Sequence, residues 1–293
     1  MEANTPSSTT GPGAGPDRRH SEAGCRACGA GETLEKGVRT VAGYSLDRCP
    51  DCGSVLADRC PADPEVAAIY EELFAGEGYL QHRREFEALK AGRRQCGRYR
   101  LAQLRRLGRE VEGRVMVELG GGTGAFGVEA VKAGWSYTDH DISPHALDCA
   151  RQLGLDARSM EPHAFPRLDP GSVDAVVMWE VLEHIWPVHA FLGAARESLR
   201  PGGALLLSTP NWRRSGYQRS DSWGPLSSPP VHLGFFDPPA LEAVLRGAGF
   251  GRVRCWTRRL YAPVPPSRKA FRRSWRLAVG LEPGPTLYAL ARV

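Results

Sequence analysis

From about residue 114 onward, short apolar segments alternate with amphipathic segments of helical period. This alternation is typical of a parallel sheet covered by helices on both faces. We therefore predict an α/β domain over residues 113–293. Helices are expected to start at Ser143-Pro144 and Asp237-Pro238, because a capping side chain followed by proline is typical of a helix start. The predicted strands are Val115–Leu119, Trp135–His140, Leu155–Arg158, Val173–Trp179, Ala204–Thr209, Arg252–Thr257 and Thr286–Arg292.

A glycine-rich turn follows the first predicted strand. The sequence VELGGGTG places Glu118 at the strand end and Gly120, Gly122 and Gly124 in the turn, directly before a helix. Glycine lets the backbone approach a ligand closely, and the first turn of the following helix offers N–H donors. The spacing differs from the G-x-G-x-x-G that holds a pyrophosphate, and the acid would repel a phosphate. The turn therefore predicts a site for a cationic ligand.

A second acidic position follows in the sequence YTDHDIS. Asp141 ends the second strand, where a carboxylate can accept both ribose hydroxyls of an adenosine ligand. Asp139 is the alternative, although it lies two residues earlier and within the strand. Taken singly, Glu118 could be a helix cap and Asp141 a turn residue. The combination of the acid pair with the glycine turn favours a nucleoside site.

These motifs resemble those of class I S-adenosylmethionine-dependent methyltransferases, in the branch near the ubiquinone-biosynthesis O-methyltransferases. The resemblance implies a seven-stranded Rossmann-like sheet with a reversed last strand, and S-adenosyl-L-methionine as the cofactor. It also implies Glu118 at the methionine end, Asp141 on the ribose, and Met160 or Glu161 beside the adenine. Trp179 is assigned to the same site. The matching stretches are VELGGGTG, HDISPHALDCAR, DAVVMWEVLEHI, SLRPGGALLLSTPN and VHLGFFDPPALEAVLRGAGF, in that order.

Polar residues follow the fourth predicted strand in the sequence WEVLEH. Open α/β sheets bind ligands at the carboxyl ends of their strands. Methyl transfer requires alignment of donor and acceptor, and a base where the acceptor is an alcohol. We predict His184 as that base, because the pKa of histidine lies near neutrality. The alternative is that His184 caps the following helix while Glu183 faces solvent.

A divalent metal is a further hypothesis for the same segment. Glu180, Glu183 and His184, with His232 later in the chain, resemble the metal site of small-RNA 2′-O-methyltransferases. The first three residues would share one side of a helical turn. A bound Mg²⁺ would lower the pKa of an acceptor hydroxyl and orient it. Glu180 and His232 therefore join His184 as candidate catalytic residues.

Two cysteine pairs precede the predicted α/β domain. Cys25 and Cys28 are separated by two residues, as are Cys49 and Cys52, and each second cysteine precedes a glycine. Four thiolates at this spacing are typical of a zinc ribbon, in which the ligand shell is closed and the metal is structural. A redox pair is the alternative for a C-x-x-C sequence. We predict a Zn²⁺ ribbon over residues 25–60.

The other segments before residue 113 are predicted from composition. Residues 1–24 are rich in Ser, Thr, Gly and Pro without apolar periodicity, so we expect a disordered tail. Residues 61–112 form a predicted helical linker, in which Asp63 caps a first helix and a basic helix covers 82–107. No apolar run approaches the roughly 20 residues that cross a bilayer, and no secretion signal is evident. We expect a cytoplasmic protein without a membrane partner.

Basic residues concentrate in two stretches. Residues 82–114 hold eleven Lys or Arg and four Glu, and residues 252–281 hold nine Lys or Arg and no acid, while the whole chain has a net charge of +5. A positive surface favours a phosphorylated, nucleotide-linked or carrier-bound substrate, or else RNA. Solvated helix faces are the other explanation.

The sequence thus predicts an S-adenosylmethionine-dependent methyltransferase with a small-molecule acceptor. An oxygen of a natural-product or sugar-like compound is the favoured acceptor, with nitrogen or carbon left open. One alternative is an RNA methyltransferase that docks nucleic acid on the ribbon and the basic helices. Another is a non-catalytic zinc-ribbon adaptor whose second domain binds the cofactor without turnover.

Overall fold

The structure is a computed structural model that describes residues 24–31, 34–62, 114–213, 227–258 and 286–293, with single positions at 64, 68, 69, 84, 87, 100 and 102. The predicted tail, the helix after Asp63, the basic helix over 82–107 and the basic stretch beyond residue 258 lie largely or wholly outside the described residues. None of the helices in the described ranges is long and apolar enough to span a membrane.

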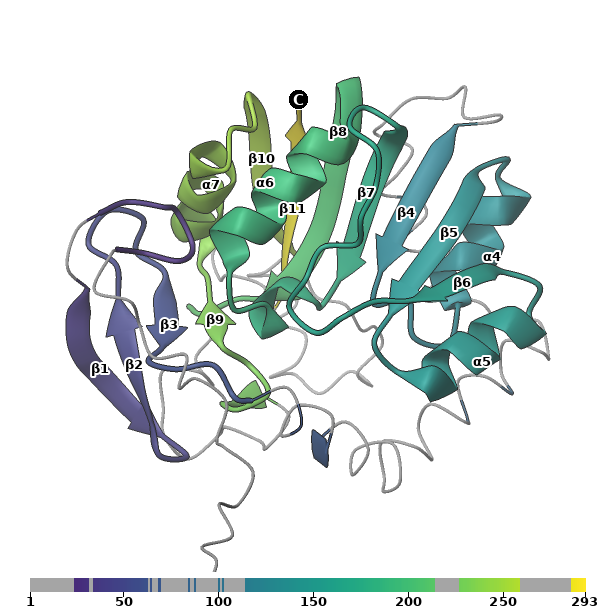
Figure 1. Cartoon of the computed structure of the whole chain (residues 1–293). Helices are drawn as coiled ribbons and strands as arrows, with labels where there is room; N and C mark the ends of the chain where they lie inside the picture. Colours follow the sequence, from purple (N-terminus) through teal and green to yellow (C-terminus); the bar gives the residue numbers. More distant parts are fainter. Residues whose placement is uncertain are drawn as a thin grey trace, which may run out of the picture.

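The main sheet consists of seven strands: β4 (Val115–Leu119), β5 (Ser136–Asp141), β6 (Asp156–Ser159), β7 (Val173–Trp179), β8 (Leu199–Pro210), β10 (Arg252–Arg258) and β11 (Thr286–Arg292). Their order is β10-β11-β8-β7-β4-β5-β6 (Figure 1). The strands from β4 to β8 in the sequence run parallel to their neighbours in the sheet, whereas β11 is antiparallel to both β8 and β10. The predicted α/β sheet with a reversed last strand is confirmed.

The predicted strand bounds agree with the structure to within one residue, except for β8. This strand begins at Leu199 rather than Ala204. Its pairing with β7 shifts register between Val173 and Ala175, and Gly202 within it has a φ of 80°. The proline and glycines of this stretch therefore form an irregular first part of the strand, which an apolar pattern does not reveal.

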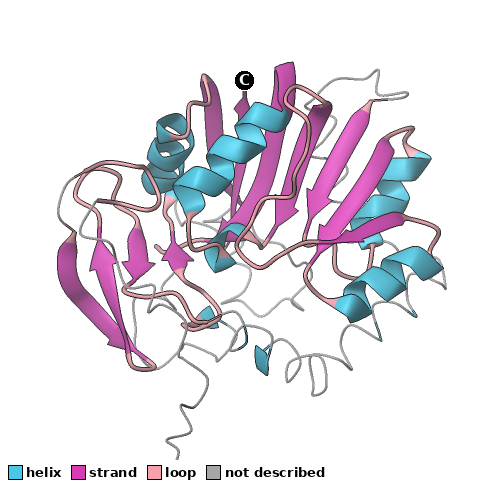
Figure 2. Cartoon of the chain, in the orientation of Figure 1, coloured by secondary structure: helices cyan, strands magenta, loops and turns pink. Residues whose placement is uncertain are grey.

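Helices cover both faces of this sheet, which Figure 2 shows in cyan against the magenta strands. Met116 and Val117 are neighbours in β4 and point to opposite faces, because side chains alternate along a strand. Met116 packs in one buried cluster with α4 (Ala125–Lys132) and α5 (Pro144–Gln152). Val117 packs in another with α6 (Val188–Ser198) and α7 (Pro238–Gly247).

The two predicted helix starts are confirmed by their caps. The Ser143 hydroxyl accepts a hydrogen bond of 3.3 Å from the Ala146 N–H at the start of α5. The Asp237 carboxylate accepts one of 3.0 Å from the Ala240 N–H at the start of α7. Each cap satisfies a backbone donor that has no partner within its helix.

A second, four-stranded sheet lies beside the main one. It contains β1 (Glu35–Val41), β2 (Tyr44–Arg48), β3 (Val55–Ala57) and β9 (Gly234–Phe235), antiparallel and in that order. The first three strands belong to the cysteine-containing segment, and β9 comes from the α/β domain, with Val55 opposite Phe235. The sequence analysis did not predict this sheet, and two of its strands, β3 and β9, are too short to show a pattern of their own.

We call residues 24–60 the cysteine module. Cys25, Cys49 and Cys52 lie in the same buried cluster as Phe191 of α6 and Val244 of α7. The module thus shares a core with the α/β domain as well as a sheet. This explains how a segment with too few apolar residues for a core of its own is packed.

Candidate active site and cysteine cluster

The glycine turn between β4 and α4 adopts a backbone that requires glycine. Gly120, Gly122 and Gly124 have φ values of 68°, 58° and 77°, in the left-handed region that side chains disfavour. A Cβ atom at Gly120 would come within 2.7 Å of Val181, whereas one at Gly122 would meet nothing within 4 Å. The middle of the turn therefore borders open space, as a turn that lies against a ligand must.

Two aspartates of β5 hold this turn in place. The Gly121 N–H donates to Asp139 Oδ1 and the Gly122 N–H donates to Asp141 Oδ2, each at 3.0 Å. Asp141 Oδ1 also accepts from the Ser143 N–H at 2.8 Å. A carboxylate oxygen can accept more than one hydrogen bond. Asp141, which ends its strand as predicted, therefore retains acceptor capacity for ribose hydroxyls.

The Asp139 side chain lies under the glycine turn and is completely buried, whereas Asp141 keeps a small exposed surface. Burial raises its pKa to about 9, with a further rise from the charges of Glu118 and Asp141. A Cβ atom at Gly121 would clash with the Asp139 carboxylate. The position therefore supports the glycine turn, and between the two aspartates the geometry favours Asp141 for the ribose.

Glu118 lies fully buried at the end of β4. The Tyr137 hydroxyl donates a hydrogen bond to Glu118 Oε2, while Oε1 has no hydrogen-bond partner among the described residues. Burial raises the pKa of Glu118 to about 7, although the Tyr137 hydrogen bond and the positive charge of Arg100 oppose this rise. A carboxylate with an open acceptor position suits the ammonium group of a methionine moiety.

Arg100 is a site residue that the sequence analysis missed. Its guanidinium lies 5.4 Å from the ring of Trp179, and its charge lowers the pKa of both Glu118 and Glu180. A guanidinium here can pair with a carboxylate. The sequence could not single out Arg100, because it is one of eleven Lys or Arg residues between positions 82 and 114.

The other predicted cofactor residues are placed around this centre. Trp179 is buried, and its ring centre lies 5.4 Å from that of Phe126 in an edge-on arrangement, so Trp179 is part of the packed core beside the candidate site. The Met160 N–H donates to the Asp141 carbonyl at 3.1 Å, and the Met160 side chain packs on the core. Glu161 is exposed. Of the two candidates for the adenine, Met160 is the one joined to Asp141.

The segment after β7 brings two glutamates, the partly buried Glu180 and the buried Glu183, to the carboxyl edge of the sheet. Glu180 has a φ of 58°, and its Oε1 accepts from the Ser208 hydroxyl at 2.6 Å. Glu183 lies in the 3-10 helix η2 (Leu182–His184), and its Oε2 accepts from the Thr209 hydroxyl at 2.9 Å. Burial raises the pKa of both carboxyl groups. The alternative that Glu183 faces solvent is wrong, because its side chain is only 2% exposed.

His184 and His232 meet next to Glu183. Their ring centres are 4.7 Å apart with the planes at 83°. His184 Nδ1 lies 2.8 Å from the Val231 carbonyl, which can only accept, so Nδ1 carries the proton and Nε2 a lone pair. Burial lowers the pKa of His184 to about 4 and that of His232 well below its ordinary value. Both rings are therefore neutral, and the expectation of a near-neutral pKa for His184 is corrected by burial.

Three of the four predicted metal-site residues are gathered. The ligand atoms of Glu183, His184 and His232 lie within 4.8 Å of one another, and Glu180 is not in this group. Glu183 Oε1 and His232 Nδ1 are buried without a hydrogen-bond partner among the described residues. Glu180 is turned away by its left-handed backbone toward Ser208, so the predicted shared helical side does not form.

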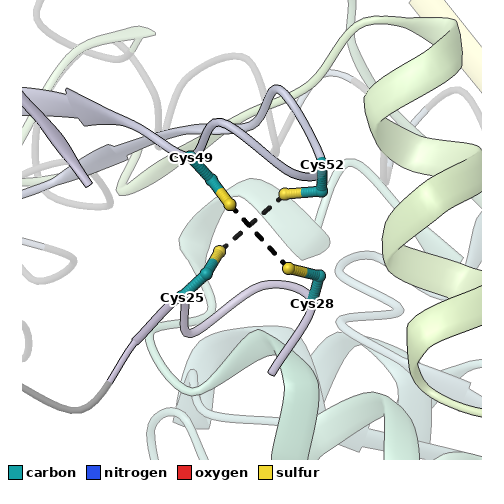
Figure 3. Close-up of side chains that lie close together, drawn as sticks. All are labelled: Cys25, Cys28, Cys49 and Cys52. Carbon is teal, nitrogen blue, oxygen red and sulfur yellow. Dashed lines mark hydrogen bonds between the residues drawn. The ribbon is translucent and has the colours of Figure 1, made fainter. Parts of the chain in front are cut away.

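The four predicted cysteine ligands converge (Figure 3). Their sulfurs all lie within 4.8 Å of one another, with 3.8 Å between Cys25 and Cys52 and 3.9 Å between Cys28 and Cys49. A tetrahedral zinc with Zn–S distances of about 2.3 Å separates its sulfurs by about 3.8 Å. A hydrogen bond with Cys52 lowers the pKa of Cys25 to about 5. The sulfur positions therefore fit a tetrahedral thiolate metal site.

The structure combines a seven-stranded α/β sheet with a glycine turn after β4 and an aspartate at the end of the adjacent strand β5. A family model described as "Methyltransferase domain" matches residues 86–254. The chain belongs to this family, and it is a class I S-adenosylmethionine-dependent methyltransferase. The matched region begins after the cysteine module.

A curated relative is the "Ubiquinone biosynthesis O-methyltransferase" of Xanthomonas euvesicatoria pv. vesicatoria. It is 32% identical over 110 residues, which are 35% of this chain and 45% of the relative. The match thus spans less than half of the relative's length.

Two solved structures share the fold. An S-adenosylmethionine-dependent methyltransferase from Mesorhizobium loti has a TM-score of 0.50 and 20% identity, covering 66% of this chain and 96% of its own. Phosphoethanolamine N-methyltransferase 2 of Haemonchus contortus, solved with phosphomonomethylethanolamine and S-adenosylhomocysteine, has a TM-score of 0.52 and 17% identity, covering 67% and 52%.

Proposed function

We propose that this methyltransferase transfers the methyl group to an oxygen of a small biosynthetic acceptor of natural-product or sugar-like kind. The observation that carries the proposal is the grouping of His184 with Glu183 and His232 at the carboxyl edge of the sheet. A hydroxyl must lose its proton during methylation, and the partly exposed His184 ring offers an unprotonated Nε2 that can accept it. The O-methyltransferase name of the curated relative agrees with this acceptor class.

Four residues are proposed to hold the donor. Asp141 accepts the ribose hydroxyls, and Met160 lies beside the adenine. Glu118 accepts from the ammonium of the methionine moiety, while Arg100 pairs with its carboxylate. These assignments are supported by the open turn at Gly122 and by the opposite charges of Glu118 and Arg100.

When bound, the donor supplies a methyl group whose bond to sulfur breaks, with the electron pair kept by sulfur, as the acceptor oxygen forms the new bond. His184 Nε2 takes the hydroxyl proton. Glu183 Oε1 lies 3.9 Å from that nitrogen, so the positive charge that develops on the ring favours the ionised form of the Glu183 carboxyl group. The Val231 carbonyl holds Nδ1 and thereby keeps the basic nitrogen facing Glu183.

A divalent metal is the second possibility for these same side chains. Glu183, His184 and His232 would hold it, and it would supply Lewis-acid activation of the acceptor hydroxyl. The orphaned Glu183 Oε1 and His232 Nδ1 support such a cation. Two imidazoles and one carboxylate suit a transition metal better than Mg²⁺. Because a metal and a proton would use the same lone pair of His184, the two roles exclude each other.

For the cysteine cluster we infer a structural Zn²⁺ held by Cys25, Cys28, Cys49 and Cys52. The support is the sulfur spacing described above. Metal analysis of the purified chain should find one zinc per molecule, and Cys49→Ser should lose it. Retention of zinc by that variant would refute the ligand set.

The test of function begins with labelled S-adenosylmethionine. Purified protein is incubated with fractionated metabolites, and the labelled product is identified by mass analysis. His184→Gln, which keeps a polar side chain without a base, should lower kcat by a factor of about 10² to 10⁴. Turnover that survives this change, or that disappears with a chelator while zinc stays bound, would contradict the base mechanism. A labelled amine nitrogen would contradict the oxygen acceptor.

A further inference from the structure

The backbone of Leu233 joins the cysteine module to the acceptor side of the active site. The Leu233 N–H donates to the Glu183 carbonyl at 2.7 Å, and the Leu233 carbonyl accepts from the Ala57 N–H at 2.9 Å. Leu233 directly follows His232 and directly precedes β9. Glu183 and His232, which flank His184 in the proposed acceptor-side cluster, are therefore tied through one residue to β3 of the cysteine module.

Arg26 makes a second connection from within the first cysteine pair. Its guanidinium carbon lies 3.3 Å from the ring centre of Trp186, and its Nη2 donates to the Ala57 carbonyl at 2.7 Å. The carbonyl of Arg26 accepts from the His189 N–H at 2.7 Å. Trp186 lies two residues after His184. The module thus contacts the segment after β7 as well as Leu233.

The packing at this contact leaves little room for independent movement. A Cβ atom at Gly29 would lie 2.8 Å from the His189 ring, and one at Gly247 would lie 2.8 Å from the Cys28 carbonyl. Close-packed contacts of this kind transmit displacement instead of absorbing it. The hydrogen bonds that hold the glycine turn, in contrast, run to Asp139 and Asp141 of β5.

We propose that the cysteine module is a positioning element of the acceptor site, which acts through Arg26 and Leu233 on Glu183, His184 and His232. The donor site does not depend on it. The inference rests on the proposed function only in naming this cluster as the acceptor side. A displaced module would move the base and its neighbours while the donor still binds.

The test uses Arg26→Gln in the full chain, since this change removes the guanidinium without touching a cysteine. Arg151→Gln is the matched control, because Arg151 Nε and Nη2 likewise donate to a backbone carbonyl, that of Ala157, at 3.2 and 2.9 Å. Three properties are measured by NMR and calorimetry: the ring signals of His184 and His232, the exchange rates of the Leu233 and Ala57 amides, and the affinity for S-adenosylhomocysteine. Cobalt absorption reports on the cysteine cluster.

We expect Arg26→Gln to shift both histidine ring signals and to raise exchange of the Leu233 and Ala57 amides about tenfold, the size expected for losing one charge-assisted hydrogen bond. The affinity for S-adenosylhomocysteine should stay within a factor of about two, as for the control. Trp186→Leu removes the opposite partner of the same contact and should give the same pattern if the first variant fails to fold.

Two results would overturn the inference. One is that both variants leave the histidine signals and the Leu233 amide no more changed than Arg151→Gln does. The other is a loss of S-adenosylhomocysteine affinity that parallels the change at His232, since the module would then act on the whole domain. If the parent chain bound no S-adenosylhomocysteine, the assigned donor site would fail, but the amide and ring signals would still decide the coupling.

Discussion

Replacing Asp141 by alanine is the sharpest test of the donor site. Asp141→Ala removes the carboxylate that is placed to accept two ribose hydroxyls. A hydrogen bond to a charged acceptor contributes about 1.5 to 3 kcal/mol. Taking the lower value for each hydroxyl, the variant loses about 3 kcal/mol of binding free energy, which corresponds to roughly 100-fold in the dissociation constant. Titration calorimetry with S-adenosylhomocysteine measures this change.

The same substitution also affects the fold. Asp141 accepts from the Gly122 and Ser143 N–H groups, so its loss should lower the free energy of unfolding by about 2 kcal/mol. Asp174→Ala is the matched control. Asp174 Oδ2 likewise accepts from a backbone N–H, that of Val115 at 2.9 Å, but at the opposite edge of the sheet. It should cost stability without changing the affinity.

A 2′-deoxy analogue of S-adenosylhomocysteine separates the ribose contact from the effect on the fold, because two proteins can then be compared with two ligands. The parent should bind it more weakly than the natural compound, while Asp141→Ala should hardly distinguish the two. The ribose assignment would be refuted if Asp141→Ala bound S-adenosylhomocysteine within threefold of the parent, or if both proteins discriminated against the analogue equally.

Two further predictions concern the same region. Because burial places the pKa of Glu118 at about 7 and the ammonium of the ligand favours the ionised form, the dissociation constant of S-adenosylhomocysteine should rise about tenfold per pH unit as pH falls below 7. Calorimetry across pH should show this slope in the parent and not in Glu118→Gln; a flat parent profile would argue against the assignment. Gly127→Ala would place a Cβ atom 2.5 Å from the Tyr137 ring and should destabilise by about 1 to 3 kcal/mol in urea unfolding. Gly193→Ala in α6, where a Cβ atom meets nothing within 4 Å, should leave stability unchanged or raise it, and equal effects at both positions would contradict the packing.

The parallel sheet could be predicted because its signals are local. β7 is apolar apart from Asp174, and Ser143-Pro144 marks the start of α5 whatever lies around it. The glycine turn and Asp141 were found for the same reason, since turn backbone and strand end are encoded within a few residues. The grouping of the four cysteines was likewise predicted from their spacing alone.

The features that were missed depend on contacts between distant segments. β9 has only two residues, and it is a strand because β3 lies beside it. Arg100 gains its importance from Glu118 and Trp179, which approach it only in the folded chain. Burial of Glu183 and the lowered pKa of His184 also arise from packing, so no inspection of the sequence WEVLEH could have distinguished a solvent-facing acid from a buried one.

The place of β11 has a consequence for how the chain is made. β11 is the last described strand in the sequence, yet it lies between β8 and β10. While the chain is still emerging from the ribosome, β8 therefore has a whole edge of N–H and C=O groups that await a partner, and β10 has nothing to pair with in this sheet. That half of the sheet can form only after translation reaches residues 286–292. A shortened product would expose the unpaired edges of β8 and β10 and would be prone to aggregate.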